Sequence, residues 1–178
     1  MGQNNSNTYG PFIARYVGDY GDNLKVSVCA SSATFSSWTY NSYFTSAPGT
    51  SDYVSAAGGS NDEMHIIVVD RTGAITGTAN TVLEKFGFVS AAVDASINGE
   101  SNYYKQVVFD KSKYIYAMDP VDYANTSSTW GTSASGTNFA TSNTIFTIAL
   151  SNGLDVAPTD GNIESGYDLF NNKDETDI

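Results

Sequence analysis

The chain has 178 residues, of which 40% are hydrophobic and 13% aromatic, enough to bury a sizeable core in one domain. Nineteen acidic and eight basic residues give a formal charge of −11, which repels nucleic acid and anionic lipid and excludes a basic binding footprint. Only 15% of residues are charged, while Ser, Thr, Asn and Gly are abundant, and this bias favours strands joined by polar loops over a helical bundle.

The sequence contains a single cysteine and no apolar segment of membrane length. Cys29 alone excludes an internal disulfide framework and a site built from several thiolates, and its run LKVSVC indicates a small core residue on a strand. No run of about 18 apolar residues occurs, and the first ten residues lack the hydrophobic region of a signal peptide, so we expect no membrane partner. Residues 1–9 are expected to form a loose tail and residues 10–178 a single domain.

The first third of the chain predicts one strand and an aromatic segment. Residues 24–29 are expected to form a strand, which a glycine-rich turn leads into the sheet. Residues 34–44 place Phe35 and Trp38 at helical spacing, but Ser, Thr and aromatic residues are mediocre helix formers. A short helix and an irregular aromatic cover both fit this segment. Residues 52–61 are rich in small residues and are expected to form a loop.

The densest apolar run lies at residues 64–69, MHIIVV, and indicates a buried strand followed by a tight turn. Gly73 can take the positive φ that a hairpin turn requires, and residues 74–76 are expected to start the returning strand. A further strand is predicted over residues 82–90. Strict alternation would put Phe86 and Phe88 of that strand on the same face.

Two short helices are expected in the second half of the chain. Ser101 is expected to cap the first, in which apolar residues recur at three- and four-residue spacing over residues 103–108. Asp160 is expected to cap the second. The apolar face of this second helix consists of Ile163, Tyr167 and Phe170.

Two more strands are predicted over residues 113–118 and 144–150, separated by the Ser/Thr/Gly-rich residues 120–138, which are expected to form an exposed loop. The order of elements predicts an α+β domain dominated by antiparallel or mixed sheet. No internal repeat at a fixed period is present. The residues expected in the main core are those on apolar or alternating strands: Met64, Ile66, Val68, Phe86, Phe88, Ile115, Phe146 and Ile148.

The sequence offers no pattern that identifies a catalytic or metal site. His65, the single histidine, lies inside the central apolar run, where a satisfied core histidine fits better than a general base. The motifs of nucleophile elbows, phosphate loops, dinucleotide sites and zinc-binding helices do not occur. Asp70 and Asp119 close strands, where Asp ordinarily forms turns. We therefore assign no catalytic, cofactor-binding or metal-binding residue and expect no cofactor.

Four collinear stretches carry a family resemblance. Residues 10–29 are GPFIARYVGDYGDNLKVSVC, and residues 60–90 are SNDEMHIIVVDRTGAITGTANTVLEKFGFVS. Residues 101–115, SNYYKQVVFDKSKYI, and residues 150–170, LSNGLDVAPTDGNIESGYDLF, follow in the same order. Together they closely resemble the contractile tail sheath proteins of myovirus-type phages, particularly those of marine cyanophages.

The resemblance implies a mechanical and non-enzymatic role. In that family, rings of six subunits stack around a tail tube, and their rearrangement shortens the sheath and drives the tube through the host envelope. The matching region is similar to a middle domain, a two-layer β-sandwich with short flanking helices. The implied location is the phage tail, assembled in the host cytoplasm, and the implied partners are other full-length sheath subunits and the tail tube.

Family members are several times longer than this chain, which lacks the terminal segments that in the family grip the tube and link neighbouring subunits. The chain therefore resembles a fragment of a longer subunit. Because those contacts are missing and each copy carries a charge of −11, we expect the isolated chain to be a monomer in dilute solution that forms neither rings nor tubes.

Two other functions compete with a sheath domain. A free-standing β-rich binding or adhesin module, such as a carbohydrate binder, would need exposed aromatic residues over a groove. A hydrolase based on carboxylates would need two acidic side chains facing each other in a cleft.

Overall fold

The main sheet of the molecule has four antiparallel strands. The computed structural model describes residues 11–118, 129–141 and 145–168, so the tail predicted for residues 1–9 lies outside the described residues. The strand order is β4–β3–β2–β8. The strands are β2 (Leu24–Cys29), β3 (Glu63–Asp70), β4 (Thr81–Ser90) and β8 (Phe146–Ala149). With the helices around this sheet, the predicted α+β class is confirmed.

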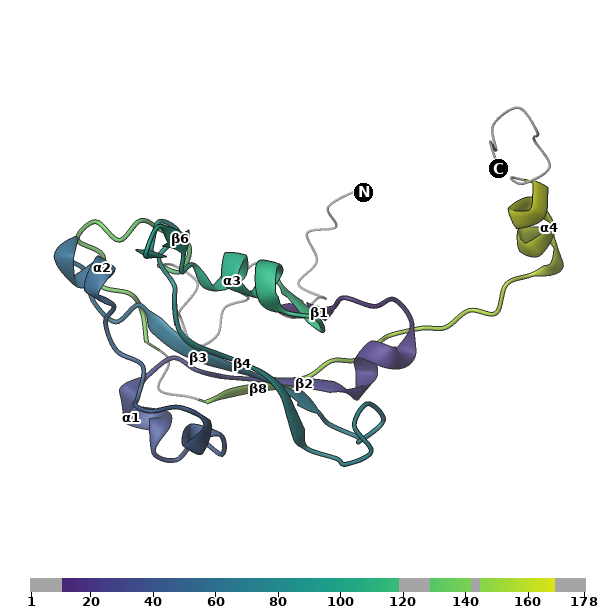
Figure 1. The fold of residues 1–178 in the computed structure, drawn as a ribbon, viewed down its shortest axis with the longest axis horizontal. Coiled ribbons are helices and arrows are strands. Elements are labelled where there is room, and N and C mark those ends of the chain that lie inside the picture. Colours follow the sequence, from purple (N-terminus) through teal and green to yellow (C-terminus); the bar gives the residue numbers. More distant parts are fainter. Residues whose placement is uncertain (1–10, 119–128, 142–144, 169–178) are drawn as a thin grey trace.

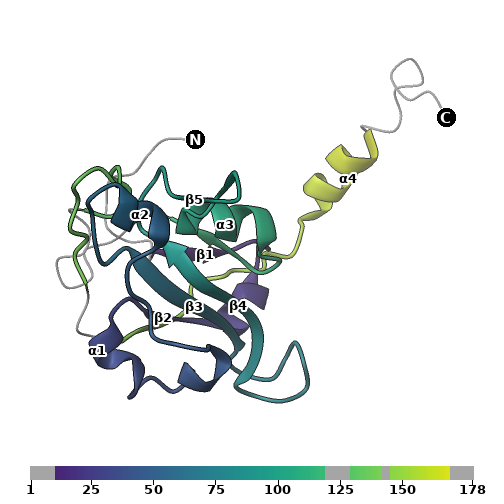
Figure 2. The same ribbon diagram turned by 60° about the vertical axis from the view of Figure 1, so that its left-hand side comes forward.

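Smaller elements cover both faces of the sheet (Figures 1 and 2). One face is covered by a two-stranded antiparallel ribbon and a helix, namely β1 (Phe12–Ala14), β7 (Ile115–Ala117) and α3 (Tyr104–Lys111). The opposite face is covered by α1 (Ser32–Phe35), η2 (Asn41–Tyr43) and the residues between them. The remaining elements are η1 (Asp19–Asn23), α2 (Asp52–Ala56), the hairpin β5 (Ser96–Ile97) to β6 (Glu100–Ser101), and α4 (Asp160–Asp168).

Strand β3 is buried on both faces, which explains why its sequence is a continuous apolar run instead of an alternating one. Met64, Ile66 and Val68 point into the main core, beneath β1, β7 and α3. Ile67 and Val69 point the other way, into a second core that contains Cys29, Trp38 and Tyr40. The predicted core place of Cys29 is thus confirmed, and residues 34–44 form an aromatic cover with only short helical turns.

The pairing of β3 with β4 contains two register shifts, between Met64 and Ile66 and between Val68 and Val69. Strict alternation fails there, so Phe86 lies in the main core while the ring of Phe88 contacts His65 on the opposite face. Phe88 also has a φ of 56°. The prediction that Phe86 and Phe88 share a face is therefore wrong.

Among the other predicted core residues, Met64, Ile66, Val68 and Ile115 are fully buried in the main core. Phe146 and Ile148 pack against it but stay partly exposed. They lie on β8, an edge strand of the sheet, and the cover over that edge is incomplete.

The connection from β3 to β4 is longer than predicted. Residues 74–76 do not start the returning strand, because residues 71–80 form a ten-residue loop and β4 begins only at Thr81. The carboxylate of Asp70 organises this loop: it accepts hydrogen bonds from the backbone N–H groups of Gly73 (2.8 Å), Ile75 (3.0 Å) and Thr76 (2.8 Å). Gly73 has the expected positive φ, 87°.

Two local predictions around the helices are also wrong. Residues 52–61 are not all loop, because Ser51 caps helix α2 by accepting a hydrogen bond from the N–H of Val54. Helix α3 takes Tyr103 as its N-cap, without a side-chain bond, whereas the hydroxyl of Ser101 accepts from the N–H of Tyr103, two residues too early to cap the helix.

The described part of the predicted exposed loop, residues 129–138, is folded onto the body. Ala134 is fully buried, and the indole of Trp130 is half-buried and donates to the carbonyl of Ala140. The carboxylate of Asp94 accepts hydrogen bonds from the Ala134 N–H (2.8 Å) and the Ser133 hydroxyl (2.7 Å), and it fixes this loop. The described residues of this loop are largely exposed, as expected, but Asp94, distant in the sequence, fixes Ser133 and Ala134 to the body.

After β8 the chain leaves the body as an arm that carries α4, and both ribbon views show α4 projecting away from the sheet (Figures 1 and 2). The base of the arm is fixed to η1, because the Gly153 N–H donates to the carboxylate of Asp22 at 2.9 Å. There Gly153 approaches the backbone of Gly18 so closely that a Cβ on Gly153 would overlap it. Helix α4 begins at Asp160, and Thr159, not Asp160, provides the capping hydroxyl.

The double burial of β3 leads to a test of the fold. Ile66→Ala removes a fully buried side chain from the main core and should lower the free energy of unfolding by about 2 to 5 kcal/mol. Ile97→Ala is the matched control, because Ile97 is 52% exposed in the β5–β6 hairpin. This variant should lower the free energy of unfolding by less than about 0.5 kcal/mol. Chemical denaturation measures both. Equal losses for the two variants would show that β3 is misplaced.

Candidate functional site

His65, the one histidine, is locked in a structural role. Its ring stacks on Phe44 with centroids 4.1 Å apart and meets Phe88 edge-on at 4.6 Å. Its Nδ1 accepts from the N–H of Phe88 (3.1 Å), so the remaining proton is on Nε2, which donates to the carbonyl of Ser46 (2.9 Å). Burial lowers the pKa of His65. The neutral, fully bonded ring fits the predicted core histidine and not a general base.

Two buried carboxylates are likewise engaged in the scaffold. Asp62 accepts hydrogen bonds from the N–H and hydroxyl of Ser51, both at 2.8 Å, and from the hydroxyl of Ser90. Asp70 organises the β3–β4 loop. Burial opposes ionisation of Asp70, but hydrogen bonds from Thr76, Gly73 and Ile75 outweigh it and leave the pKa lowered. The turn role predicted for Asp70 is what the structure shows, whereas Asp119 lies outside the described residues.

One pair of acids does face each other, at the base of the arm. The pKa of Asp19 is raised, first by a hydrogen bond with the carboxyl of Asp155 and then by its negative charge. The Asp155 carboxylate also accepts from the Asp19 N–H at 3.3 Å. Asp19 is exposed on η1, and neither acid lines one of the two cavities described below. Neither of these two cavities therefore gives the pair the cleft that a hydrolase based on two carboxylates needs.

Within residues 11–118, 129–141 and 145–168, no group of three or more His, Cys, Asp and Glu side chains could hold a metal ion. In the same ranges, every helix is too short or too polar to cross a bilayer.

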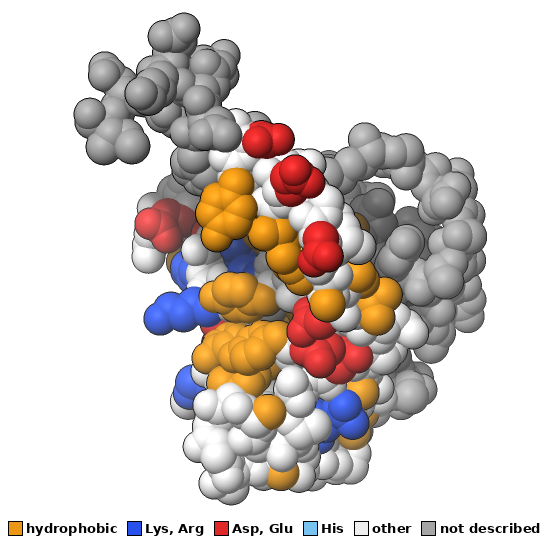
Figure 3. Space-filling view, turned by 90° about the vertical axis from the view of Figure 1, so that its right-hand side faces the viewer, with side chains coloured by type: hydrophobic (Ala, Val, Ile, Leu, Met, Phe, Trp, Pro, Cys, Tyr) orange, Lys and Arg blue, Asp and Glu red, His pale blue; other side chains and the backbone are white. Residues whose placement is uncertain are grey.

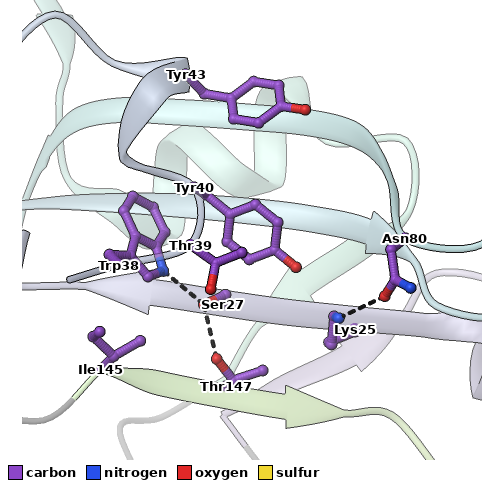
Figure 4. Close-up of a pocket in the computed structure, with 9 residues that line it drawn as sticks. All are labelled: Lys25, Ser27, Trp38, Thr39, Tyr40, Tyr43, Asn80, Ile145 and Thr147. Atoms are coloured by element: carbon purple, nitrogen blue, oxygen red, sulfur yellow. Dashed lines mark hydrogen bonds between the residues drawn. The ribbon is translucent and has the colours of Figure 1, made fainter. Parts of the chain in front are cut away.

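A cavity of about 410 Å³ lies between the sheet and the aromatic cover (Figure 4). At its floor the indole N–H of Trp38 donates to the hydroxyl of Ser27 (2.9 Å), which also bonds the hydroxyl of Thr147 (2.8 Å). At one end Lys25 donates to the side-chain carbonyl of Asn80 (3.0 Å). The remaining lining residues are Thr39, Tyr40, Tyr43 and Ile145.

The chemistry of this cavity is that of a small neutral polar ligand site. Tyr43 exposes 44% of its surface at the rim, and the ring of Tyr40 lies deeper, 6.4 Å from it. Hydroxyl and amide groups surround these rings, and among the described lining residues Lys25 alone is charged. Such a site offers aromatic faces and hydrogen-bonding groups together, which suits a sugar ring.

A second hollow, which we call the tyrosine groove, has a volume of about 480 Å³ and is lined by Tyr16, Tyr20, Lys113 and Tyr114. Tyr16 and Tyr20 meet edge to face at 5.7 Å, and Tyr16 is 56% exposed. Figure 3, which views the molecule from the side of α4, shows hydrophobic side chains on this side of the body, with both basic and acidic side chains around them.

Neither hollow was predicted as a site. The only sequence signal was the high tyrosine content, twelve residues, which does not say which tyrosines remain exposed. The tyrosine groove joins residues 16–20 to residues 113–114 through the pairing of β1 with β7. That pairing cannot be deduced from strands of three residues each.

Comparison with known proteins relates part of this chain to a phage protein. A stretch of 94 residues, half of this chain, is 32% identical to the tail sheath protein of Salmonella phage ViI. The match covers 13% of that protein, so the chain spans a small part of the relative's length. No family model matches the chain. The similarity supports a relationship to tail sheath proteins, which agrees with the resemblance seen in the sequence and is consistent with a structural, non-enzymatic role.

The environment of His65 predicts a pH dependence of stability. The pKa is near 6.5 in the unfolded chain and lower in the folded one, so the folded state favours the neutral ring. The stabilisation of the folded state by the neutral ring is fully present above pH 6.5. It is lost as the pH falls, because His65 of the unfolded chain binds a proton at a higher pH than His65 of the folded chain. His65→Gln, which cannot titrate, should lose less free energy of unfolding than the parent between pH 7.5 and pH 5.5. Urea denaturation at both pH values measures this, and equal losses would contradict the assigned ring state.

Proposed function

We propose that this chain is a domain of a subunit of a contractile phage tail sheath, with a structural role and no catalytic one. The observation that carries the proposal is the 32% identity over 94 residues to a phage tail sheath protein. In this proposal residues 10–178 form a middle domain of a longer subunit from a myovirus-type phage. The subunit is assembled in the host cytoplasm and resides in the virion tail. Its partners are further sheath subunits and, through segments outside this chain, the tail tube.

The physical properties of the domain suit this role. A sheet buried on both faces and closed by two cores resists deformation, because close-packed interiors have low compressibility. The charge of −11 keeps isolated copies apart until specific contacts join them. The buried acids and the single histidine are engaged in hydrogen bonds within the scaffold.

Immunogold electron microscopy tests the proposal. Antibodies raised against this chain should label the tail of phage particles that carry its gene, at regular positions along the sheath, in both extended and contracted particles. Antibodies incubated beforehand with the purified chain are the control and should label nothing. Gold confined to the capsid, the fibres or the host surface would refute a sheath role.

The cavity beneath Tyr43 favours a second candidate function, the binding of a saccharide of the host surface. Its mixture of tyrosine rings, hydroxyl groups and an amide is the composition expected of a sugar site. A free-standing binding module would use this cavity as its principal site, and a sheath domain would not need it.

Calorimetric titration with oligosaccharides from the host envelope tests this second function. If a sugar stacks on Tyr43, Tyr43→Ala should weaken its binding about fivefold, which corresponds to about 1 kcal/mol. Tyr53→Ala is the matched control, because Tyr53 is similarly exposed, on α2, and does not line the cavity. No measurable heat at millimolar sugar with the parent chain excludes the saccharide function.

A further inference from the structure

Helix α4 presents an apolar stripe that nothing in the described chain covers. Ile163 and Tyr167 lie four residues apart and so share one face of the helix, and Tyr167 is 72% exposed. In the extended segment before the helix, Leu154 and Val156 are each 75% exposed. Exposed apolar side chains gathered on one short arm indicate a contact surface.

The same arm is acidic on the neighbouring face of the helix. Asp160, Glu164 and Asp168 follow one another at four-residue intervals and therefore form a second stripe beside the apolar one. Residues 151–168 contain these three acids and Asp155, and they contain no Lys or Arg. A surface that covers α4 must therefore combine an apolar centre with a basic flank.

The tyrosine groove has this combination. Tyr16, Tyr20 and Tyr114 provide the apolar lining, and Lys113 stands at its edge. Arg15 directly follows strand β1, and its guanidinium stacks over the ring of Tyr116, 4.1 Å from the ring centroid. Four of the chain's eight basic residues lie in or next to β1, α3 and β7. They are Arg15, Lys105, Lys111 and Lys113.

The arm is directed away from the groove of its own chain. Its base is fixed by the bond from Gly153 to Asp22, and Pro158 restricts Ala157 to an extended conformation just before α4. Both ribbon views show α4 beyond the edge of the body (Figures 1 and 2). We propose that α4 of one copy docks in the tyrosine groove of a second copy, with Ile163 and Tyr167 against the tyrosines and the acidic stripe towards Lys113.

Such a contact does not depend on the chain belonging to a sheath, and it is weak. A nine-residue helix is about 14 Å long, so it buries less than the roughly 800 Å² per partner of a standard interface. The chain is then still a monomer at micromolar concentration. The groove becomes occupied by α4 of another copy where copies are crowded, at high concentration or within a polymer.

Paramagnetic relaxation in mixed samples tests the proposal with the full chain. Ser165→Cys on α4 accepts a nitroxide label, because Ser165 is exposed while Cys29 is buried and stays unlabelled. Labelled chain at natural isotope abundance is mixed with ¹⁵N-labelled parent chain at about 0.5 mM. The proposal requires amide broadening in the ¹⁵N-labelled copies that is strongest at residues 16–20 and 113–117.

Two substitutions with matched controls identify the contacts. Lys113→Glu should weaken the broadening about two- to fivefold at low salt, the range of an exposed ion pair, whereas Lys85→Glu, the same charge change on β4, should not. Ile163→Gln combined with Tyr167→Gln removes the apolar stripe without introducing a helix breaker and should abolish the broadening. Amide spectra of each variant verify that the body remains folded.

Every other outcome overturns the proposal. Absence of broadening at 0.5 mM means that α4 finds no second copy. Broadening that is strongest elsewhere on the body means a different docking site. Broadening seen only when the nitroxide and the ¹⁵N label are on the same chain, diluted with unlabelled chain, means that α4 folds back onto its own groove.

Discussion

The double burial of strand β3 is the constraint on which the rest of the structure depends. A strand with apolar side chains on both faces requires two covers, and the chain supplies them from different parts of its length. The ribbon β1–β7 and α3 close one face, and the aromatic segment around Trp38 closes the other. Each cover is too small to form a core alone, so both depend on the sheet for burial.

The same constraint determines where polar groups can lie. His65 is part of β3 and faces the aromatic cover, where a charged imidazole would have no partner, so its two nitrogen atoms are satisfied by the backbone of Phe88 and Ser46. Asp62 and Asp70 lie at the two ends of the strand and hold the loops that enter and leave it. These three side chains are in this way committed to the scaffold, and the two surface hollows contain mostly tyrosine and hydroxyl groups.

The sequence allowed the strands to be predicted where burial leaves a local pattern. Residues 24–29 and 64–69 are short β-branched runs, and both are strands. Prediction failed where distant partners decide the conformation. The face of Phe88 depends on a register shift against β3, the length of the 71–80 loop depends on the Asp70 carboxylate, and the burial of Ala134 depends on Asp94. The tyrosine groove was missed for the same reason, since its two halves lie about 100 residues apart.

The attachment of the arm has a mechanical consequence. Helix α4 is connected to the body through β8, which lies antiparallel to β2 at the edge of the main sheet. A tension applied to α4 first reaches the close contact of Gly153 with Gly18 and the bond to Asp22, before it reaches the sheet. If that junction yields, force directed along β8 loads the hydrogen bonds to β2 side by side, so they share the load instead of breaking one after another. The arm is thus joined to the strand through which the domain can bear a pull.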